Sequence, residues 1–325
     1  METLLDVHGA TALLSTDCGD FTHLIRSNYE VFLAKELLEP NLNITFSQEA
    51  GYLAKKKKKS MPRLSEGLYQ GKDSLYWENE FGFVVHISFK SFKEWNIYGY
   101  HFDLDNHNQN EEDLRNYTRS MRWMVHFPLF SLLKKYQSMR LVHASAISKN
   151  SNALIFAGLN KVGKSSLSRY LYENYQYEFM SDNFLLTDGK RVYGFPEKNR
   201  LAPDSLENLK ISSRDNKKIY GKFHLPFDKN RLELRSQPKS VFIVNNHKDL
   251  KIECISRDSA LNSLEGMHSY LQEFPEYTFF SMLDSFDSWK ERDCSLFPED
   301  VEFYRIYLPL DWSLSETAEK VLECI

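Results

Sequence analysis

The residues of this chain whose types and spacing could do chemistry are concentrated in residues 158–165, which read Gly-Leu-Asn-Lys-Val-Gly-Lys-Ser. This order fits the phosphate-binding loop, in which a glycine and four further residues precede Gly-Lys-Ser or Gly-Lys-Thr. Glycine tolerates positive φ angles, so backbone N–H groups near Gly158 and Gly163 can turn inward toward a phosphate. We expect Lys164 to contact the β- and γ-phosphates and the Ser165 hydroxyl to bind Mg²⁺.

Loops of this kind lie between a strand and a helix, and the flanking sequence predicts both. Residues 152–157 are a short apolar run typical of a buried strand, and residues 165–174 are typical of a helix. A strand over residues 141–147 and a polar turn would form a hairpin that leads into the loop. The helix would present the positive end of its dipole to a bound anion. The other loop and helix residues expected to contact the nucleotide are Asn160, Lys161, Val162 and Ser166.

A carboxylate follows this helix. Residues 177–186 predict a strand that carries Asp182 partway along, and the turn signal Asp188-Gly189 predicts a return strand over residues 191–195. A carboxylate in this place could orient an acceptor hydroxyl and help to bind Mg²⁺. The alternative is a solvated carboxylate or a turn residue.

Two further side chains are candidates with a structural alternative. His143 lies among apolar residues of the strand before the loop, where a hydrogen-bonded core histidine is the alternative to a catalytic one. Arg200 follows Pro196 on a predicted loop, and its planar guanidinium suits phosphate, although an ordinary surface arginine fits as well. The histidines without metal-ligand spacing include His101, His126 and His224.

The rest of the second half predicts short strands and two more helices. Strands are expected over residues 240–245, 251–256 and 301–308. Asp258 can cap a helix that ends near Leu271, and Ser313 with Glu316 forms a capping box for a helix that ends near Cys324. Because turns link most of these strands, the pattern does not favour a regularly alternating, wound α/β sheet.

The first half, residues 1–138, predicts a sheet-rich α+β domain. A strand over residues 81–89 should pair with residues 95–102, and one or two helices are expected within residues 116–136, where Pro128 marks a break or a start. Residues 22–38 fit a helix or a strand. Polar loops are expected at residues 103–113 and at the lysine run Lys55–Lys59, for which an electrostatic dock for an acidic partner is the alternative.

Composition indicates an ordinary globular chain. Of its 325 residues, 42% are hydrophobic and 26% are charged, and the length favours two domains. The net charge of -4 counts against nucleic acid as the principal partner. The sequence shows neither a signal peptide nor an apolar run long enough for a membrane span, so we expect a cytoplasmic protein. The cysteines expected to be reduced and mostly buried are Cys18, Cys254, Cys294 and Cys324.

The second half resembles the HPr kinase-related family over about residues 139–325. The likeness lies in the phosphate loop together with the segments Leu-Val-His-Ala-Ser-Ala (141–146), Ser-Asp-Asn (181–183), Phe-Pro (195–196), Asn-Arg-Leu-Ala-Pro-Asp (199–204) and Phe-Tyr-Arg-Ile-Tyr (303–307). The resemblance implies an α/β (α+β) architecture, in which a phosphoenolpyruvate-carboxykinase-like P-loop core stands beside a separate sheet-rich N-terminal domain. It also implies ATP and Mg²⁺ as cofactors.

The resemblance assigns roles to particular residues. The family carries paired aspartates after the loop helix, and the first, matched by Asp182, acts as a base toward the acceptor hydroxyl or helps to place Mg²⁺. Asn183 replaces the second aspartate, which removes one negative charge. The resemblance places His143 near the phosphates and makes Arg200 a phosphate ligand. Ser166 stands where HPr kinase has a glutamate, and the first half is unlike that enzyme, so HPr is not the expected substrate.

Three functions fit these residues. The first is an ATP-dependent kinase that phosphorylates a hydroxyl, either on Ser or Thr of a peptide or protein or on a small molecule. The second is a nucleotide-binding regulator with ATPase activity at most, which the replacement at Asn183 favours. The third is an interaction module that uses the first half and its lysine run. A homo-oligomer is compatible with each, whereas the acceptor has no legible motif.

Overall fold

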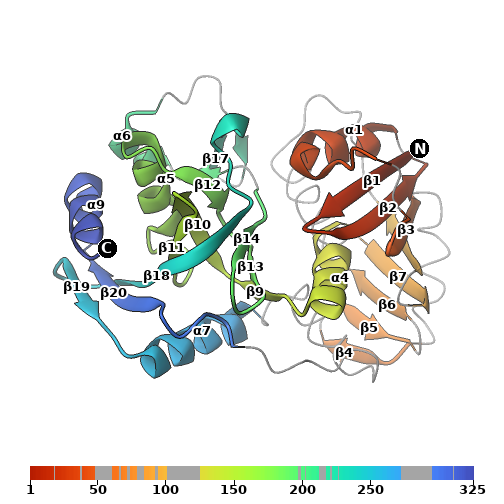
Figure 1. The fold of residues 1–325 in the computed structure, drawn as a ribbon. Coiled ribbons are helices and arrows are strands. Elements are labelled where there is room, and N and C mark those ends of the chain that lie inside the picture. Colours follow the sequence, from red (N-terminus) through yellow and green to blue (C-terminus); the bar gives the residue numbers. More distant parts are fainter. Residues whose placement is uncertain are drawn as a thin grey trace. The chain divides into compact units, whose positions relative to one another are not determined.

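A computed structural model shows a mixed α/β chain with two large open sheets (Figure 1). It describes residues 1–17, 19–36, 39–47, 61–65, 67–71, 74–78, 84–91, 94–100, 125–196, 199–201, 203–211, 217–219, 222–225, 227–271, 295–309 and 311–325. The chain forms two compact units, one built mainly from Met1–Gln137 and the other from Ser138–Phe274 with Lys290–Ile325.

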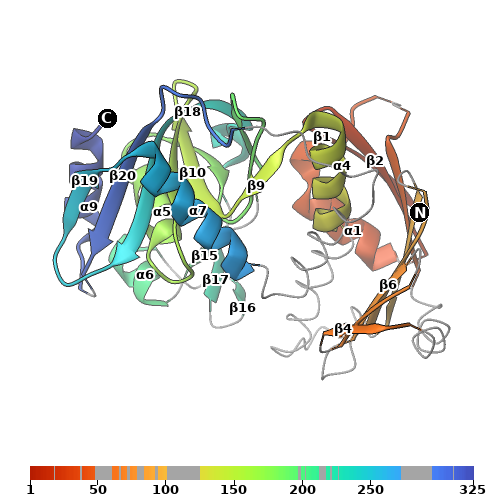
Figure 2. The ribbon, with the colours of Figure 1, turned by 90° about the horizontal axis from the view of Figure 1, so that it is seen from below.

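The first unit contains an eight-stranded sheet with helices on one face (Figure 2). In sheet order its strands are β1 (Glu2–Val7), β2 (Ala10–Thr16), β3 (Leu42–Ser47), β8 (Glu94–Tyr100), β7 (Val84–Ser91), β6 (Ser74–Glu78), β5 (Leu68–Gln70) and β4 (Arg63–Ser65). The helices are α1 (Gly19–Asn28), the short η1 (Glu30–Phe32) and α4 (Phe127–Gln137). Alternating apolar residues build the core, as in β3, where Leu42, Ile44 and Phe46 are buried.

The predicted strand pair of the first unit is confirmed, since β7 and β8 pair antiparallel. Residues 22–38, for which the sequence left helix and strand open, contribute to α1 and η1 where they are described. Pro128 lies at the start of α4, directly after the π-helical residues Val125 and His126. The predicted loops at Lys55–Lys59 and 103–113 lie outside the described residues.

The second unit is organised around a nine-stranded mixed sheet. Its strands are β9 (Arg140–Val142), β10 (Ala144–Lys149), β11 (Asn152–Ala157), β12 (Glu178–Ser181), β13 (Leu185–Thr187), β14 (Val192–Gly194), β18 (Arg235–Asn246), β19 (Lys251–Cys254) and β20 (Glu302–Leu308). The order is β12-β10-β11-β18-β14-β13-β9, and β20 pairs with both β18 and β19. Only β11–β18 and β18–β20 are parallel among the described pairs of this sheet. Most neighbouring strands are therefore antiparallel and do not alternate regularly with helices. This agrees with the sequence, which did not favour a wound α/β sheet.

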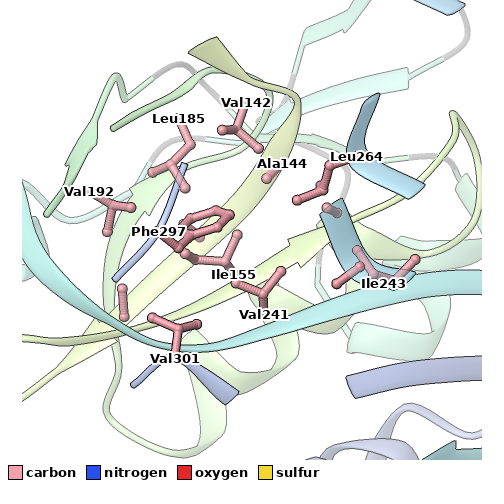
Figure 3. Close-up of a cluster of buried hydrophobic side chains, with 14 of the residues drawn as sticks. Val142, Ala144, Ile155, Leu185, Val192, Val241, Ile243, Leu264, Phe297 and Val301 are labelled. Atoms are coloured by element: carbon pink, nitrogen blue, oxygen red, sulfur yellow. The ribbon is translucent and has the colours of Figure 1, made fainter. Parts of the chain in front are cut away.

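Helices cover both faces of this sheet (Figure 1). Helix α5 (Lys164–Asn174) and helix α9 (Leu314–Glu323) pack on one face over Phe156, Phe242 and Val244. Helix α7 (Arg257–Leu271) packs on the other, where Leu264 belongs to the same buried cluster as Ile155 and Val241 (Figure 3). Along β11, residues that face α5 and α9 alternate with residues that face α7, because successive side chains of a strand point to opposite faces of the sheet.

Smaller elements complete the unit. They are β15 (Asn199–Leu201), β17 (Lys222–Leu225) and β16 (Lys217–Ile219), which form a three-stranded sheet, with α6 (Pro203–Leu209) and η3 (Lys229–Arg231). The predicted capping residue Ser313 accepts a hydrogen bond from the Glu316 N–H at the start of α9.

No helix within the described ranges is long and apolar enough to cross a membrane.

The hairpin of β13 and β14 is closed by Asp188. Its carboxylate accepts hydrogen bonds from the N–H groups of Lys190 (2.8 Å) and Arg191 (2.7 Å) and from the Tyr193 hydroxyl (2.8 Å). Burial alone would raise the pKa of Asp188, but these hydrogen bonds outweigh it, so the pKa lies below its ordinary value. The turn signal in the sequence is thereby confirmed.

Some sequence predictions are wrong in ways that matter for the site. The predicted strand 141–147 is interrupted at His143, because β9 pairs with β13 whereas β10 pairs with β11 and β12. The predicted strand 177–186 is likewise two strands, β12 and β13, with Asp182 in the bend between them. Arg200 belongs to β15 and not to a loop.

The prediction of mostly buried cysteines is also wrong. Cys254 is exposed and Cys324 is partly buried, and both are free thiols. The reason for the first is its place at the end of β19, a strand that pairs only with β20 in the described structure. Cys18 and Cys294 lie outside the described residues.

Candidate phosphate-binding site

The predicted hairpin leads into the glycine loop. Strands β10 and β11 pair antiparallel from Lys149 opposite Asn152 to Ala144 opposite Ala157. Asn150 (φ 53) and Ser151 (φ 58) form its tight turn in the left-handed region, which asparagine tolerates better than most residues. The loop starts directly after Ala157, so a rigid, fully buried strand end holds it.

Close contacts explain both loop glycines. A Cβ atom on Gly158 would lie 2.5 Å from the backbone oxygen of Val244 on the neighbouring strand. Gly163 has a φ angle of 99 and is the N-cap of α5, and a Cβ atom there would lie 2.7 Å from Cζ2 of Trp312. No other residue type fits either position without displacing a neighbour.

Lys164 points back into the loop. Its side chain is only 6% exposed, and Nζ donates hydrogen bonds to the carbonyl oxygens of Gly158 and Leu159, each at 2.8 Å. The ammonium group therefore bridges from the first turn of α5 to the start of the loop. A phosphate bound here would meet this cation together with the N–H groups at the beginning of α5, which the side-chain-free Gly163 leaves uncapped.

The other predicted loop ligands divide into two groups. Asn160 and Lys161 are exposed, and Lys161 has a φ angle of 67, so the backbone turns sharply there. Val162 is buried in the cluster beneath α5 and α9, so its side chain serves the core and only its backbone is available to a ligand. Ser165 is partly buried at the start of α5.

Strand pairing brings Asp182 and His143 to the same sheet edge as the loop. Ala144 lies opposite Ala157, so His143 continues the chain beside Gly158. On the other side of β10, Ala146 pairs with Ser181, so Asp182 is the next residue beyond the end of β12. Asp182 is 1% exposed, and burying a carboxylate is expensive, which makes it a candidate functional group.

A chain of serines links these elements, and the sequence alone did not indicate it. The Ser145 hydroxyl lies 2.6 Å from that of Ser168 on α5 and donates to the Ser181 carbonyl at 3.2 Å. The Ser168 hydroxyl also lies 3.2 Å from the Ser165 carbonyl, so its single proton can go to that carbonyl or to the Ser145 oxygen. Ser181 in turn donates to Phe184 across the bend that contains Asp182. The bend and the first turn of α5 are thus tied through β10.

A second hydroxyl contact joins α5 to the segment that carries Arg200. The Ser166 hydroxyl donates to the Ser205 hydroxyl at 2.9 Å, so this predicted nucleotide ligand contacts α6. Strand β15, on which Arg200 pairs with His224, packs beside α5. The structure therefore places the Arg200 backbone next to the helix that follows the loop.

Two of the gathered residues could hold Mg²⁺. They are Ser165 and Asp182, the pair expected from the sequence. Within the described ranges, no group of three or more His, Cys, Asp and Glu side chains could hold a metal. Mg²⁺ often takes only one or two protein ligands and completes its shell with water and substrate phosphates, so the donor set fits Mg²⁺ bound together with a nucleotide.

Comparison with known proteins adds no relative. No protein-family model matches the chain, and the search of curated proteins finds no significant match. Any functional assignment therefore rests on the residues and geometry of the chain itself.

Proposed function

We propose that the chain is an ATP-dependent kinase that transfers the γ-phosphate to a hydroxyl group. In this proposal residues 139–325 form an HPr-kinase-like P-loop core, and residues 1–138 form a recognition or regulatory domain. The observation that carries the proposal is the register of β10, β11 and β12, which puts the loop with Lys164 and Ser165 and the buried Asp182 at the same end of neighbouring strands. The hairpin before the loop also supports it, because an antiparallel strand and a tight turn lead into the loop, unlike the connections of an all-parallel sheet.

Each residue has a task in phosphoryl transfer, where the protein mainly positions groups and stabilises charge. Lys164 exchanges its loop carbonyls for the β- and γ-phosphates. Asp182 accepts the proton of the acceptor hydroxyl as its oxygen bonds to the γ-phosphorus and the bond to the ADP oxygen breaks. Ser165 and Asp182 would hold Mg²⁺, which would neutralise phosphate charge. His143 and Arg200 contact the phosphates from the flanking strand and from β15.

The acceptor is a hydroxyl on Ser or Thr of a peptide or protein, or on a small molecule. The net charge of -4 gives the chain no overall basic field, which counts against nucleic acid as the acceptor. Specificity would then come from the first unit and from the segments around α6.

Calorimetry and phosphate transfer test the proposal together. ATP·Mg²⁺ should bind the wild-type protein, and Lys164→Ala should weaken binding by at least about tenfold, because a charge-assisted contact is lost. The matched control is Lys149→Ala, which removes a lysine at the far end of the same hairpin. Transfer of labelled γ-phosphate to peptide, protein and metabolite pools should fall by about a hundredfold or more in Asp182→Asn. Equal transfer by wild type and Asp182→Asn would refute the kinase mechanism.

The same measurements distinguish a second function. Asn183 supplies an amide where a second carboxylate would assist metal binding, which favours a nucleotide-binding regulator with ATPase activity at most. That function predicts ATP binding that depends on Lys164, with no γ-phosphate transfer to any acceptor pool. If Lys164→Ala bound ATP and transferred phosphate as well as wild type does, both functions would be refuted.

A further inference from the structure

An arginine on the opposite face of the sheet faces two serines. Arg305 lies on β20 two residues after Phe303, so both side chains point to the face that α7 covers. Ser259 and Ser263 lie one turn apart on α7, and the Arg305 guanidinium is directed at both. This cluster is separate from the loop, which curves toward α5 on the other face.

The hydrogen bonds of this cluster leave donors unused. Nη2 of Arg305 donates to the hydroxyl oxygens of Ser259 (3.1 Å) and Ser263 (3.5 Å). Ser263 itself donates to the Ser259 carbonyl at 2.8 Å. The Ser259 hydroxyl, which is partly exposed, donates to no acceptor in the described part of the chain. Nε of Arg305 is buried and also meets no acceptor among the described residues.

The guanidinium also lacks a counter-ion in direct contact. Glu253 lies opposite Arg305 in the β19–β20 pair and near enough for the two charges to attract, but its carboxylate is hydrogen-bonded by Lys251 and by the Tyr307 hydroxyl. No ion pair joins Arg305 to a carboxylate among the residues that the structure describes. A partly buried cation with unsatisfied donors is costly unless an anion completes it.

We propose that Arg305 and Ser259 form a second phosphate-binding site, which takes a phosphate group either free or esterified to Ser259. Arginine binds phosphate through two parallel N–H groups, and Nη2 and Nε are the adjacent donors that this requires. Ser259 lies in the first turn of α7, where the helix dipole favours a negative group. An ester would form by attack of the Ser259 oxygen on the γ-phosphorus of a nucleoside triphosphate, with release of the nucleoside diphosphate and the hydroxyl proton.

Thermal unfolding of the full chain in inorganic phosphate, against chloride at equal ionic strength, measures binding of the free group. The Lys164→Ala background removes the contribution of the glycine loop, so the result is independent of the proposed kinase function. Arg305→Gln should weaken phosphate binding by at least about tenfold, since a charged hydrogen-bonding partner is lost. The control Arg235→Gln removes an exposed arginine on β18 and should have no effect. If Arg305→Gln does not fold, Ser259→Ala keeps the arginine and should still weaken binding.

Peptide mass mapping of the protein purified from cells measures the esterified form. A phosphoryl group on Ser259, with a higher unfolding temperature for the phosphorylated wild type than for phosphorylated Arg305→Gln, would identify the ester as the ligand. Phosphate binding that Arg305→Gln weakens, without a phosphoryl group on Ser259, would identify the free ion. Phosphate affinity that is unchanged in Arg305→Gln, together with an unmodified Ser259, would overturn the proposal.

Discussion

Replacing Gly163 by alanine tests whether the geometry of the glycine loop is as tight as the structure shows. Gly163 ends the loop and caps α5 with a φ angle of 99, a conformation that residues with a Cβ atom rarely adopt. The new methyl group would also lie 2.7 Å from Cζ2 of Trp312 and 3.2 Å from Cδ1 of Leu308. Two independent penalties therefore act at one position.

Their sizes can be estimated separately. The left-handed backbone costs a residue with a Cβ atom about 1–2 kcal/mol. Forcing a methyl group against a ring carbon is overpacking, which costs about 1–3 kcal/mol after the neighbours shift. Gly163→Ala should therefore lower the free energy of unfolding by about 2–5 kcal/mol, and ATP·Mg²⁺ affinity should fall because the loop N–H groups move. In a Trp312→Ala background the closer contact is removed and only the contact with Leu308 remains, so the cost of the same change should fall toward the backbone cost of about 1–2 kcal/mol.

The same chemical change elsewhere is the matched control. Gly266 lies within α7 with nothing within 4 Å of an added Cβ atom, so Gly266→Ala should stabilise the protein by about 0.5–1 kcal/mol. Urea denaturation, followed by circular dichroism, measures both variants against wild type. A Gly163→Ala protein as stable as wild type, or a Gly266→Ala protein less stable than wild type by more than about 1 kcal/mol, would refute the reasoning.

Three further measurements follow from the contacts described above. Asp188→Ala removes three hydrogen bonds from a partly exposed carboxylate and should cost about 1–2 kcal/mol at pH 7. Because the folded pKa is lowered, this stabilisation is present above the unfolded pKa and is lost as the pH falls through the folded value. The stabilities of wild type and variant should therefore converge in acid, and a difference that grows in acid would contradict this. Ser168→Ala removes the buried partner of Ser145 and should lower the free energy of unfolding by about 1–2 kcal/mol in urea titrations. An unchanged urea midpoint of unfolding would exclude a stabilising serine network. Iodoacetamide should alkylate Cys254 before Cys324, which peptide mass mapping can follow. Cys254 is exposed, whereas burial and then the nearby Glu323 raise the pKa of the Cys324 thiol. Faster alkylation of Cys324 near pH 8 would contradict this.

Local signals in the sequence predicted the glycine loop and its neighbours correctly. The turn residues Asn150 and Ser151, the apolar run of β11 and the helix after Gly163 each follow from a few adjacent residues. The capping residue Ser313 and the turn residue Asp188 were legible for the same reason. Where a residue type has one dominant local use, its structure can be predicted without knowledge of the fold.

Predictions failed where a strand changes its partner. Apolar residues flank His143 directly, and they stand on both sides of Ser181-Asp182-Asn183, so the pattern in the sequence was interpreted as unbroken strands. Pairing with distant segments decides the breaks, since β9 and β10 hydrogen-bond to different strands. The serine chain through Ser145 and Ser168 was invisible for a related reason, because small polar residues have no signature until the fold brings them together.

The inward position of Lys164 has a consequence for ligand affinity. By bonding to the Gly158 and Leu159 carbonyls, its side chain closes the loop into a ring before any ligand arrives. The entropy of shaping the loop is therefore lost during folding and not during binding, which leaves more of the interaction energy for the ligand itself. Binding becomes an exchange of acceptors at a fixed cation, so a ligand must offer oxygens that compete with two backbone carbonyls. Phosphate oxygens meet that condition, because their negative charge makes them stronger acceptors than a neutral carbonyl.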